Sequence, residues 1–135
     1  LAYPLHIVTD TAQIRKNLEY YIEKVPVKKT PAMSKSIYSI LYARLGNAQK
    51  ALYYFYDSYL PNLNPPFRVI AEFDGGTNPY FITGAGGTLQ SIIFGFAGLD
   101  ITDKGLKPTY APLLPEEWTS LTITVAGKEI VHIKK

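Results

Sequence analysis

Cysteine is absent from this 135-residue chain, which excludes disulfides and metal sites with thiolate ligands. Histidine occurs twice, at His6 and His132, and two isolated positions favour structural or surface roles over a metal centre. No apolar run approaches the ~20 residues that a membrane-spanning helix needs. We therefore expect no metal, no cofactor and no membrane partner.

Charge is modest and shows no pattern of a nucleic-acid binder. The net charge of +3 comes from scattered basic residues, and no basic stripe carries interleaved aromatic side chains. Apolar residues make up 47% of the chain, enough for the core of one domain of this length. The chain begins at Leu1 without Met and ends in strand-like residues Ile130 to Lys135, so we expect both ends to lie within a longer protein. The compartment stays open.

A first helix is predicted directly after Asp10. This aspartate can cap the helix with Gln13 as the third helical residue, and the helix should end before Pro26. A linker follows, to Pro31. The apolar face expected to be buried consists of Ile14, Leu18, Tyr21, Ile22 and Val25.

Two further helices are predicted as antiparallel neighbours. The second starts at Ser34 or Ser36 and ends at Gly46, and Asn47 caps the third at once. So short a connection places the two helices side by side. Their expected buried residues are Ile37, Ile40, Leu41 and Leu45 in the second, and Ala51, Leu52, Phe55 and Tyr59 in the third.

The third helix is rich in aromatic residues, which allows two interpretations. The residues are Tyr53, Tyr54, Phe55, Tyr56 and Tyr59. They could form a wall on which sugars stack, or they could be ordinary packing residues whose hydroxyls reach water. Packing is favoured, because these residues lie all round the helix.

Residues 65–98 combine three kinds of local sequence. Residues 65–71 predict a stiff, extended approach, because two prolines begin them. Residues 72–79 carry turn chemistry, with two glycines and an Asn-Pro pair. A fourth helix is predicted from Thr83 to Gly98. Its apolar face, at helical spacing, consists of Leu89, Ile92, Ile93 and Phe96.

Small residues crowd the start of the fourth helix, at Gly84, Ala85, Gly86 and Gly87. Glycine costs about 1 kcal/mol relative to alanine in a helix interior, so several together need a reason. Either another backbone packs very close, or bare backbone N–H groups at the helix start face a ligand. Close packing is favoured for any single glycine.

The same stretch resembles the C-terminal end of the catalytic domain in family 65 glycoside hydrolases. That family includes disaccharide phosphorylases, acid trehalases, kojibiose hydrolases and the glucosidases that trim glucosylgalactosylhydroxylysine, and the hydrolase branch is the most similar. The matching residues are Pro66-Phe67-Arg68-Val69, Glu72, Gly75-Gly76, Phe81-Ile82-Thr83-Gly84-Ala85-Gly86-Gly87-Thr88-Leu89-Gln90 and Phe94-Gly95-Phe96-Ala97-Gly98.

The resemblance implies an architecture. Residues 1–98 would be the last helices of an (α/α)6 catalytic barrel, and residues 99–135 the start of a C-terminal β-sandwich. The run 114–118, Leu-Pro-Glu-Glu-Trp, is similar to the family's entry into that β-domain, with Trp118 as a packing anchor. Alternating residues in 121–125 and 130–133 independently predict a hairpin, with its turn at 126–128.

The resemblance also implies chemistry. Glu72 matches the general base of an inverting α-glucoside hydrolase, which activates water while a second carboxyl group protonates the leaving oxygen. That acid lies far upstream in the family, so we expect the isolated chain to be inactive and to need the upstream part as a partner. The residues expected to contact the carbohydrate are Thr83, Gly84, Gly86, Gly87 and Gln90. Considered alone, Glu72 would more readily be a solvated loop acid.

Two other functions stay open at this point. A disaccharide phosphorylase would use phosphate as the nucleophile, but the family's His-Gly-Ser-Ser stretch is replaced here by residues 29–34. Residues 30–34, Thr-Pro-Ala-Met-Ser, instead resemble the Gly-Pro-Ala-Met-Thr run of the hydrolase branch. The other alternative is a non-catalytic module that binds carbohydrate or is purely structural. Apolar faces left uncovered by absent helices would also favour self-association.

Overall fold

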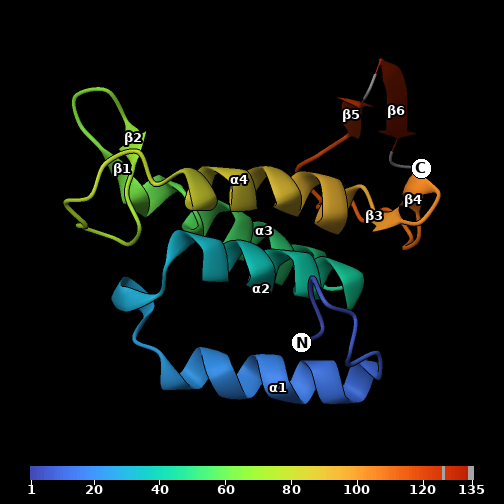
Figure 1. The fold of residues 1–135 in the computed structure, drawn as a ribbon, viewed down its shortest axis with the longest axis horizontal. Coiled ribbons are helices and arrows are strands. Elements are labelled where there is room, and N and C mark those ends of the chain that lie inside the picture. Colours follow the sequence, from blue (N-terminus) through green and yellow to red (C-terminus); the bar gives the residue numbers. More distant parts are fainter. Residues whose placement is uncertain (126, 134–135) are drawn as a thin grey trace.

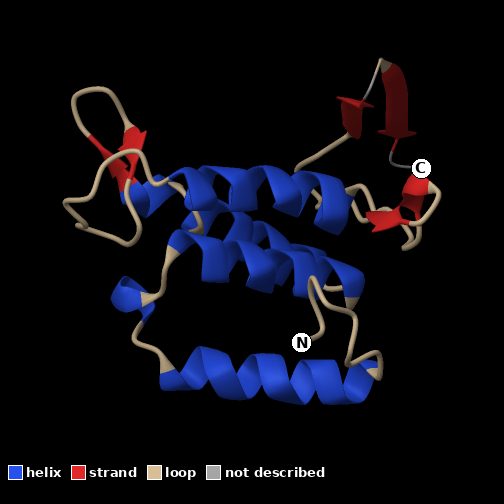
Figure 2. Cartoon of the chain, viewed as in Figure 1, coloured by secondary structure: helices blue, strands red, loops and turns tan. Residues whose placement is uncertain are grey.

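The computed structural model describes residues 1–125 and 127–133, which are mainly helical with short strand pairs (Figures 1 and 2). The α-helices are α1 (Thr11–Lys24), α2 (Ala32–Arg44), α3 (Ala48–Asp57) and α4 (Ile82–Gln90). Short helical turns are η1 (Val27–Lys29), η2 (Leu60–Asn62) and the π-helical η3 (Ser91–Phe96), which continues α4. The strands are β1 (Leu63–Asn64), β2 (Val69–Ile70), β3 (Leu99–Thr102), β4 (Gly105–Pro108), β5 (Ser120–Val125) and β6 (Lys128–Ile133).

Helix α2 is the centre of the helical layer. It lies between α1 and α4, and α3 runs back along it (Figure 1). The hydrophobic core draws on α1, α2, α3 and η3 and consists of Leu18, Tyr42, Ala43, Ala51, Leu52 and Phe96. Trp118, just before β5, packs on this core with its ring 4.7 Å from that of Phe96. Trp118 is therefore a packing residue of the helical core, and its role as anchor of a β-domain stays a prediction.

The caps of α1 and α3 agree with the prediction. Asp10 accepts a hydrogen bond from the backbone N–H of Gln13 at 2.7 Å, and Asn47 accepts one from the N–H of Lys50 at 3.0 Å. Gly46 ends α2 with a φ of +76°, a conformation that glycine adopts without steric cost. Local chemistry alone fixes these boundaries.

The predicted start of α2 at Ser34 or Ser36 is wrong. The helix begins at Ala32 after Pro31, which offers no side-chain cap. The N–H of Ala32 donates instead to the carbonyl oxygen of Glu72 at 2.7 Å. A tertiary partner thus satisfies the helix start, which no local cap signal could reveal.

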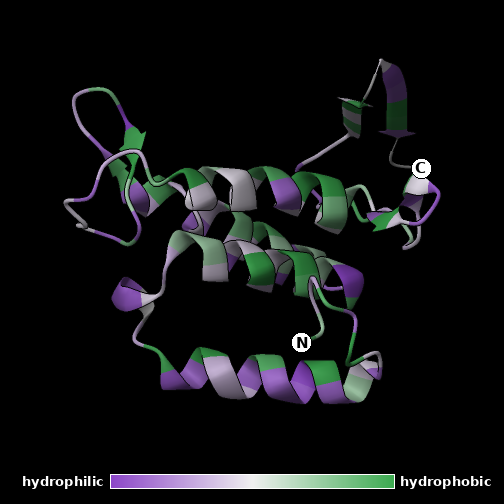
Figure 3. Ribbon diagram, in the orientation of Figure 1, coloured by the Kyte–Doolittle hydropathy of each residue, from purple (hydrophilic) through white to green (hydrophobic). Residues whose placement is uncertain are grey.

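The predicted apolar faces of α1 and α2 are only partly buried. Of these residues, Leu18 and Ile40 are buried, whereas Tyr21 is 61% exposed. Green and purple alternate along α1 in Figure 3, as expected of a helix with one apolar face. The space between the two helices is a cavity of about 460 Å³ that is also open to solvent. It is lined by Leu1, Ala2, Tyr3, Ile14, Asn17, Leu18, Tyr21, Val25, Ser34, Ile37, Tyr38 and Leu41.

The predicted apolar face of the fourth helix is also only partly buried. Leu89 is 65% exposed, Ile92 and Ile93 are half-buried, and of the four predicted residues Phe96 alone is buried. The face that packs on α2 instead carries Gly84, Gly87, Ser91 and Gly95.

Small residues on α2 explain why this glycine face is the buried one. A Cβ on Gly84 would lie 2.8 Å from the Cβ of Ala32, and one on Gly87 would lie 2.7 Å from the Sδ of Met33. Ser91 donates its hydroxyl to the carbonyl oxygen of Ser36 at 3.2 Å, within the same contact. Close packing is confirmed as the reason for Gly84 and Gly87.

The extended approach predicted for residues 65–71 is interrupted by a turn. β1 pairs with β2 in antiparallel register, Asn64 opposite Val69, so residues 65–68 reverse the chain. Arg68 closes the turn with a φ of +53°. An arginine rarely adopts that conformation, and the sequence therefore gives no sign of it.

The later strands form two separate antiparallel pairs. The predicted hairpin is confirmed as β5 and β6, with Val125 opposite Lys128; Ala126 of its turn, Lys134 and Lys135 lie outside the described residues. The pair of β3 and β4 was not predicted. The barrel, the sandwich and the division into domains at residue 98 stay predictions.

The aromatic residues of α3 mostly serve packing. Tyr54 stacks on Tyr42 with ring centroids 5.6 Å apart, and Phe55 meets Phe96 edge-on at 5.8 Å. Burial is the main cause that raises the pKa of Tyr54, to about 12, and the nearby Tyr42 adds to it. Tyr53 is the most exposed of the group. The arrangement supports packing over a continuous sugar-stacking wall.

Candidate functional site

The loop from β2 to α4 lies at the end of the molecule where α2 and α4 both begin (Figure 1). Its first residues are held tightly. The N–H of Ala71 donates to the carbonyl oxygen of Asn62 at 2.8 Å, and the N–H of Phe81 donates to that of Ile70 at 2.9 Å. Ala71 and Asn62 are completely buried. The backbone that leads into Glu72 is therefore held in place.

Glu72 is held by its main chain and half-exposed at its side chain. Its carbonyl oxygen accepts two hydrogen bonds, from the N–H of Ala32 at 2.7 Å and from the Nδ2 of Asn62 at 3.3 Å. Its carboxylate accepts one from the Nδ2 of Asn78 at 3.3 Å. The ion pairs found among the described residues do not include Glu72. The carboxylate thus reaches solvent without a cation that neutralises it.

The rest of the loop folds back towards Glu72. Gly76 donates its N–H to the carbonyl oxygen of Phe73 at 2.9 Å, and its own carbonyl oxygen accepts from the Nδ2 of Asn64 at 2.8 Å. This turn brings Asn78 level with Glu72, whose N–H donates to the Oδ1 of Asn78 at 3.4 Å.

The predicted carbohydrate contacts do not share one surface. Thr83 is exposed and Gly86 has open space where a Cβ would be, but Gly84 and Gly87 are buried against α2. Gln90 lies further along α4, where its Oε1 accepts from the hydroxyl of Tyr3 at 2.5 Å. A carbohydrate role for these residues stays a prediction, and the packing of Gly84 and Gly87 makes Thr83 and Gly86 the more accessible candidates.

Sequence reasoning missed two asparagines that contact Glu72. Asn78 was part of a turn signal, and Asn62 lies in the short turn that follows α3. Neither position has a local pattern that points to a carboxylate partner. Each asparagine reaches Glu72 only because the chain reverses direction between the two residues. Two exposed aromatic residues also flank the loop: Phe67 is 83% exposed, and Tyr80 is exposed at a φ of +62°.

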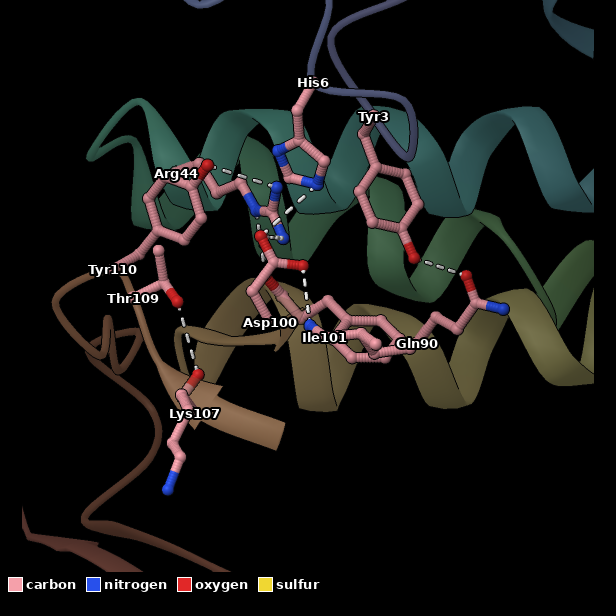
Figure 4. Close-up of polar contacts among 10 residues, drawn as sticks. Tyr3, His6, Arg44, Gln90, Asp100, Ile101, Lys107, Thr109 and Tyr110 are labelled. Atoms are coloured by element: carbon pink, nitrogen blue, oxygen red, sulfur yellow. Dashed lines mark hydrogen bonds and ion pairs between the residues drawn. The ribbon is translucent and has the colours of Figure 1, made fainter. Parts of the chain in front are cut away.

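A second polar cluster lies at the opposite end of α2 (Figure 4). The guanidinium of Arg44 lies between the rings of Tyr3 and Tyr110, at 5.0 and 4.2 Å from their centroids. Its Nη2 is 3.4 Å from the Oδ2 of Asp100, and the Nε2 of His6 is 3.3 Å from the same oxygen. These contacts join the N-terminal segment, α2 and β3. The side chains of Arg44 and Asp100 are largely buried in this cluster, which indicates a structural role.

The described residues offer no other obvious reaction centre. In residues 1–125 and 127–133, no group of three His, Asp or Glu side chains could hold a metal ion. None of the described helices is both long and apolar enough to cross a bilayer.

Comparison with known proteins connects the chain to glycoside hydrolases. No family model matches. The chain is 57% identical over 129 residues to a kojibiose hydrolase from Mucilaginibacter mallensis and 54% identical to one from Flavobacterium johnsoniae. Each match covers 96% of this chain and 19% of the relative. A protein-glucosylgalactosylhydroxylysine glucosidase from Dictyostelium discoideum is 35% identical, with 91% of this chain and 17% of that protein covered.

The chain matches a segment of a family 65-like glycoside hydrolase. It spans about a fifth of the length of the curated relatives that it matches, at 19% and 17%. The resemblance to the hydrolase branch is thus confirmed, since the named relatives are themselves glycoside hydrolases. The chain is similar to the two kojibiose hydrolases along nearly its whole length.

Proposed function

We propose that the chain is part of a longer glycoside hydrolase that cleaves α-glucosides with inversion, and that Glu72 is its general base. One observation carries the proposal. Glu72 is rigidly held at the start of α2, yet its carboxylate reaches solvent and accepts a hydrogen bond only from the neutral Asn78 among the contacts found. A structural carboxylate would more often be paired with a cation.

The position of Glu72 suits the activation of a water molecule. Glu72 would accept a proton from water as that water attacks the anomeric carbon, while a carboxylic acid on the opposite side of the sugar protonates the departing oxygen. In inverting enzymes the two carboxyl groups lie about 6.5–9.5 Å apart, which leaves room for the water. The proposed acid belongs to another part of the longer protein, so the isolated chain should not turn over substrate.

The similarity of residues 30–34 to the hydrolase branch has a physical explanation in the contact with Glu72. Ala32 donates its N–H to Glu72, so this stretch directly supports the proposed base. The names of the two kojibiose hydrolases favour an α-linked glucose disaccharide such as kojibiose as substrate. The linkage that this protein prefers is part of the proposal.

The test is Glu72→Gln in the longer protein, assayed on kojibiose and on an aryl α-glucoside. The substitution keeps the shape of the side chain and removes its basicity, so we expect turnover to fall by about 10²–10⁴-fold. NMR of the first product formed should show β-glucose, the inverted anomer. Asp74→Asn, in the same loop, is the matched control and should leave the rate nearly unchanged.

Four results would contradict the proposal in different ways. Unchanged turnover in Glu72→Gln would remove the base from Glu72, and initial release of α-glucose would exclude inversion. Turnover that requires inorganic phosphate would assign phosphorolysis in place of hydrolysis. Activity of the isolated 135-residue chain that is lost in Glu72→Gln would show that no further carboxyl group is needed.

A further inference from the structure

We infer that Asn78 is a positioning residue, whose side-chain amide sets the orientation of the Glu72 carboxylate. The inference rests on the proposed function of Glu72 as a general base. It concerns a residue that makes no direct contact with the reacting atoms and acts through Glu72.

The main chain of Glu72 is held by hydrogen bonds and by the buried Ala71 before it, which leaves the side-chain torsions as the remaining freedom. The carbonyl oxygen is held by the first N–H of α2 and by Asn62, a side chain with no exposed surface. Ala71, the preceding residue, is equally buried and is held by the carbonyl oxygen of Asn62. A long acidic side chain on such a fixed backbone can still adopt several rotamers. Something must select among these rotamers if the carboxylate is to hold a water in one place.

Asn78 provides this selection through a reciprocal pair of hydrogen bonds. Its Nδ2 donates to the Oε2 of Glu72 at 3.3 Å, and its Oδ1 accepts from the N–H of Glu72 at 3.4 Å. The orientation of the amide follows from these partners. A flipped amide would place its oxygen against the carboxylate and its NH2 against the backbone N–H, and both contacts would be repulsive. The side chain of Asn78 thus connects the backbone N–H of Glu72 with the carboxylate of the same residue.

Gly76 gives the amide of Asn78 its place. A Cβ at this position would lie 3.1 Å from the Oδ1 of Asn78 and 3.0 Å from the carbonyl oxygen of Phe73. The carbonyl of Phe73 belongs to the backbone and cannot easily move aside. A side chain at position 76 would therefore displace the side chain of Asn78. Pro79 restricts Asn78 to extended backbone conformations. The loop is therefore shaped around this amide.

Orientation matters to the reaction because a general base must lie within hydrogen-bond reach of the water that it activates. Misplacement of a reacting group by about 1 Å can lower a rate by about 10²-fold. Loss of Asn78 should therefore act on the chemical step. Binding of the substrate, which depends on other residues, should change little.

The experiment compares Asn78→Ala and Asn78→Asp in the longer protein. Aspartate keeps the shape of asparagine and the acceptor for the N–H of Glu72, but it cannot donate to the carboxylate. We expect both variants to lower kcat by about 10- to 100-fold with a nearly unchanged KM. A residue that only shapes the loop would tolerate aspartate, so wild-type kcat in Asn78→Asp would overturn the inference.

A double-mutant cycle separates this inference from the proposed function. If Asn78 acts only through the Glu72 carboxylate, Asn78→Ala should lower the residual rate of Glu72→Gln by less than about twofold. An equal loss in both backgrounds would show that Asn78 acts independently and would overturn the inference. Retained activity in Glu72→Gln alone would instead overturn the proposed function.

Stability measurements exclude a general folding defect. The hydrogen bonds to Asn78 are exposed, so the thermal midpoint of Asn78→Ala should stay close to that of the unmodified protein. Asn17→Ala, on α1, is the matched control and should change neither kcat nor the midpoint. Gly76→Ala should reproduce the kcat defect, since it displaces the amide and keeps Asn78; an unaffected kcat there would count against the inference.

Discussion

Gly84 and Gly86 lie close together on one helix, but the space beside their Cα atoms is filled at Gly84 and empty at Gly86. A Cβ on Gly84 would lie 2.8 Å from the Cβ of Ala32 and 2.9 Å from the Cδ1 of Phe81. A Cβ on Gly86 would meet nothing within 4 Å. The first glycine is required by packing, whereas the second only weakens the helix relative to alanine.

Alanine at these two positions should therefore have opposite effects on stability. We expect Gly84→Ala to destabilise the protein by about 1–3 kcal/mol through overpacking against α2. Gly86→Ala should stabilise it by about 0.4–1 kcal/mol, because the backbone of the unfolded chain loses freedom. Urea unfolding of the longer protein, monitored by circular dichroism, measures both.

Activity of the same variants tests the predicted carbohydrate contact at Gly86. If the backbone there approaches the sugar, Gly86→Ala should raise KM while it raises stability. A more stable variant with unchanged KM would mean that Gly86 faces solvent without a role. Two variants that shift the urea midpoint in the same direction would contradict the packing explanation.

At the scale of single residues, the sequence predicted the proposed base but not its support. Glu72 stood out through its resemblance to the family pattern, which spans a short continuous stretch. Asn62 and Asn78 approach Glu72 only after the chain reverses at residues 65–68 and again in the glycine loop. Contacts between residues that are distant in sequence produce no local pattern from which they could be predicted.

At the scale of elements, prediction succeeded where a helix carries its own boundary. Asp10 and Asn47 each cap a helix through a hydrogen bond to the N–H three residues on. It failed for α2, whose first N–H is satisfied by Glu72, and for α4, whose buried face is made of glycine and serine. Hydrophobic periodicity assumes that large apolar residues mark the buried face, and two helices in close contact reverse that assumption.

The cluster around Arg44 holds elements together that are distant in sequence. Arg44 and Asp100 have side chains only 6% and 11% exposed, so each charge depends on the other. We expect Arg44→Ala to destabilise the protein by about 3–5 kcal/mol, because it leaves the buried Asp100 carboxylate with the His6 imidazole in place of its guanidinium partner. The decrease in the free energy of unfolding can be measured by urea denaturation.

Two further variants show whether charge or packing carries this effect. Arg44→Lys keeps the charge but loses the planar stacking between Tyr3 and Tyr110, and it should lie between the wild type and Arg44→Ala. The pair Arg44→Met with Asp100→Asn should recover part of the loss, since no unpaired charge remains. Arg15→Ala, on the exposed side of α1, is the control. A double variant less stable than Arg44→Ala would contradict an electrostatic origin.

At the scale of the whole molecule, large apolar side chains remain in contact with water. The outer face of α4 carries Ile82, Gly86 and Leu89 at helical spacing, with Ile82 81% and Leu89 65% exposed. Large exposed apolar side chains on one face of a helix can mark a place where another chain or segment packs. The rest of a longer hydrolase would be one way to cover it.

The isolated chain should therefore self-associate. We expect sedimentation velocity to show dimers or larger species whose fraction rises with protein concentration, because burial of apolar surface stabilises association. Ile82→Gln with Leu89→Gln should shift the distribution towards monomer. Ile101→Gln, at an exposed apolar position on β3, is the matched control and should leave the distribution unchanged.

The comparison of these variants locates the surface that associates. If both the α4 variant and the β3 control reduce association equally, then exposed apolar area in general drives it, and the α4 face has no special role. If the unmodified chain stays monomeric at high concentration, the uncovered face is tolerated in water, and the case for a further segment packing on α4 loses its main physical support.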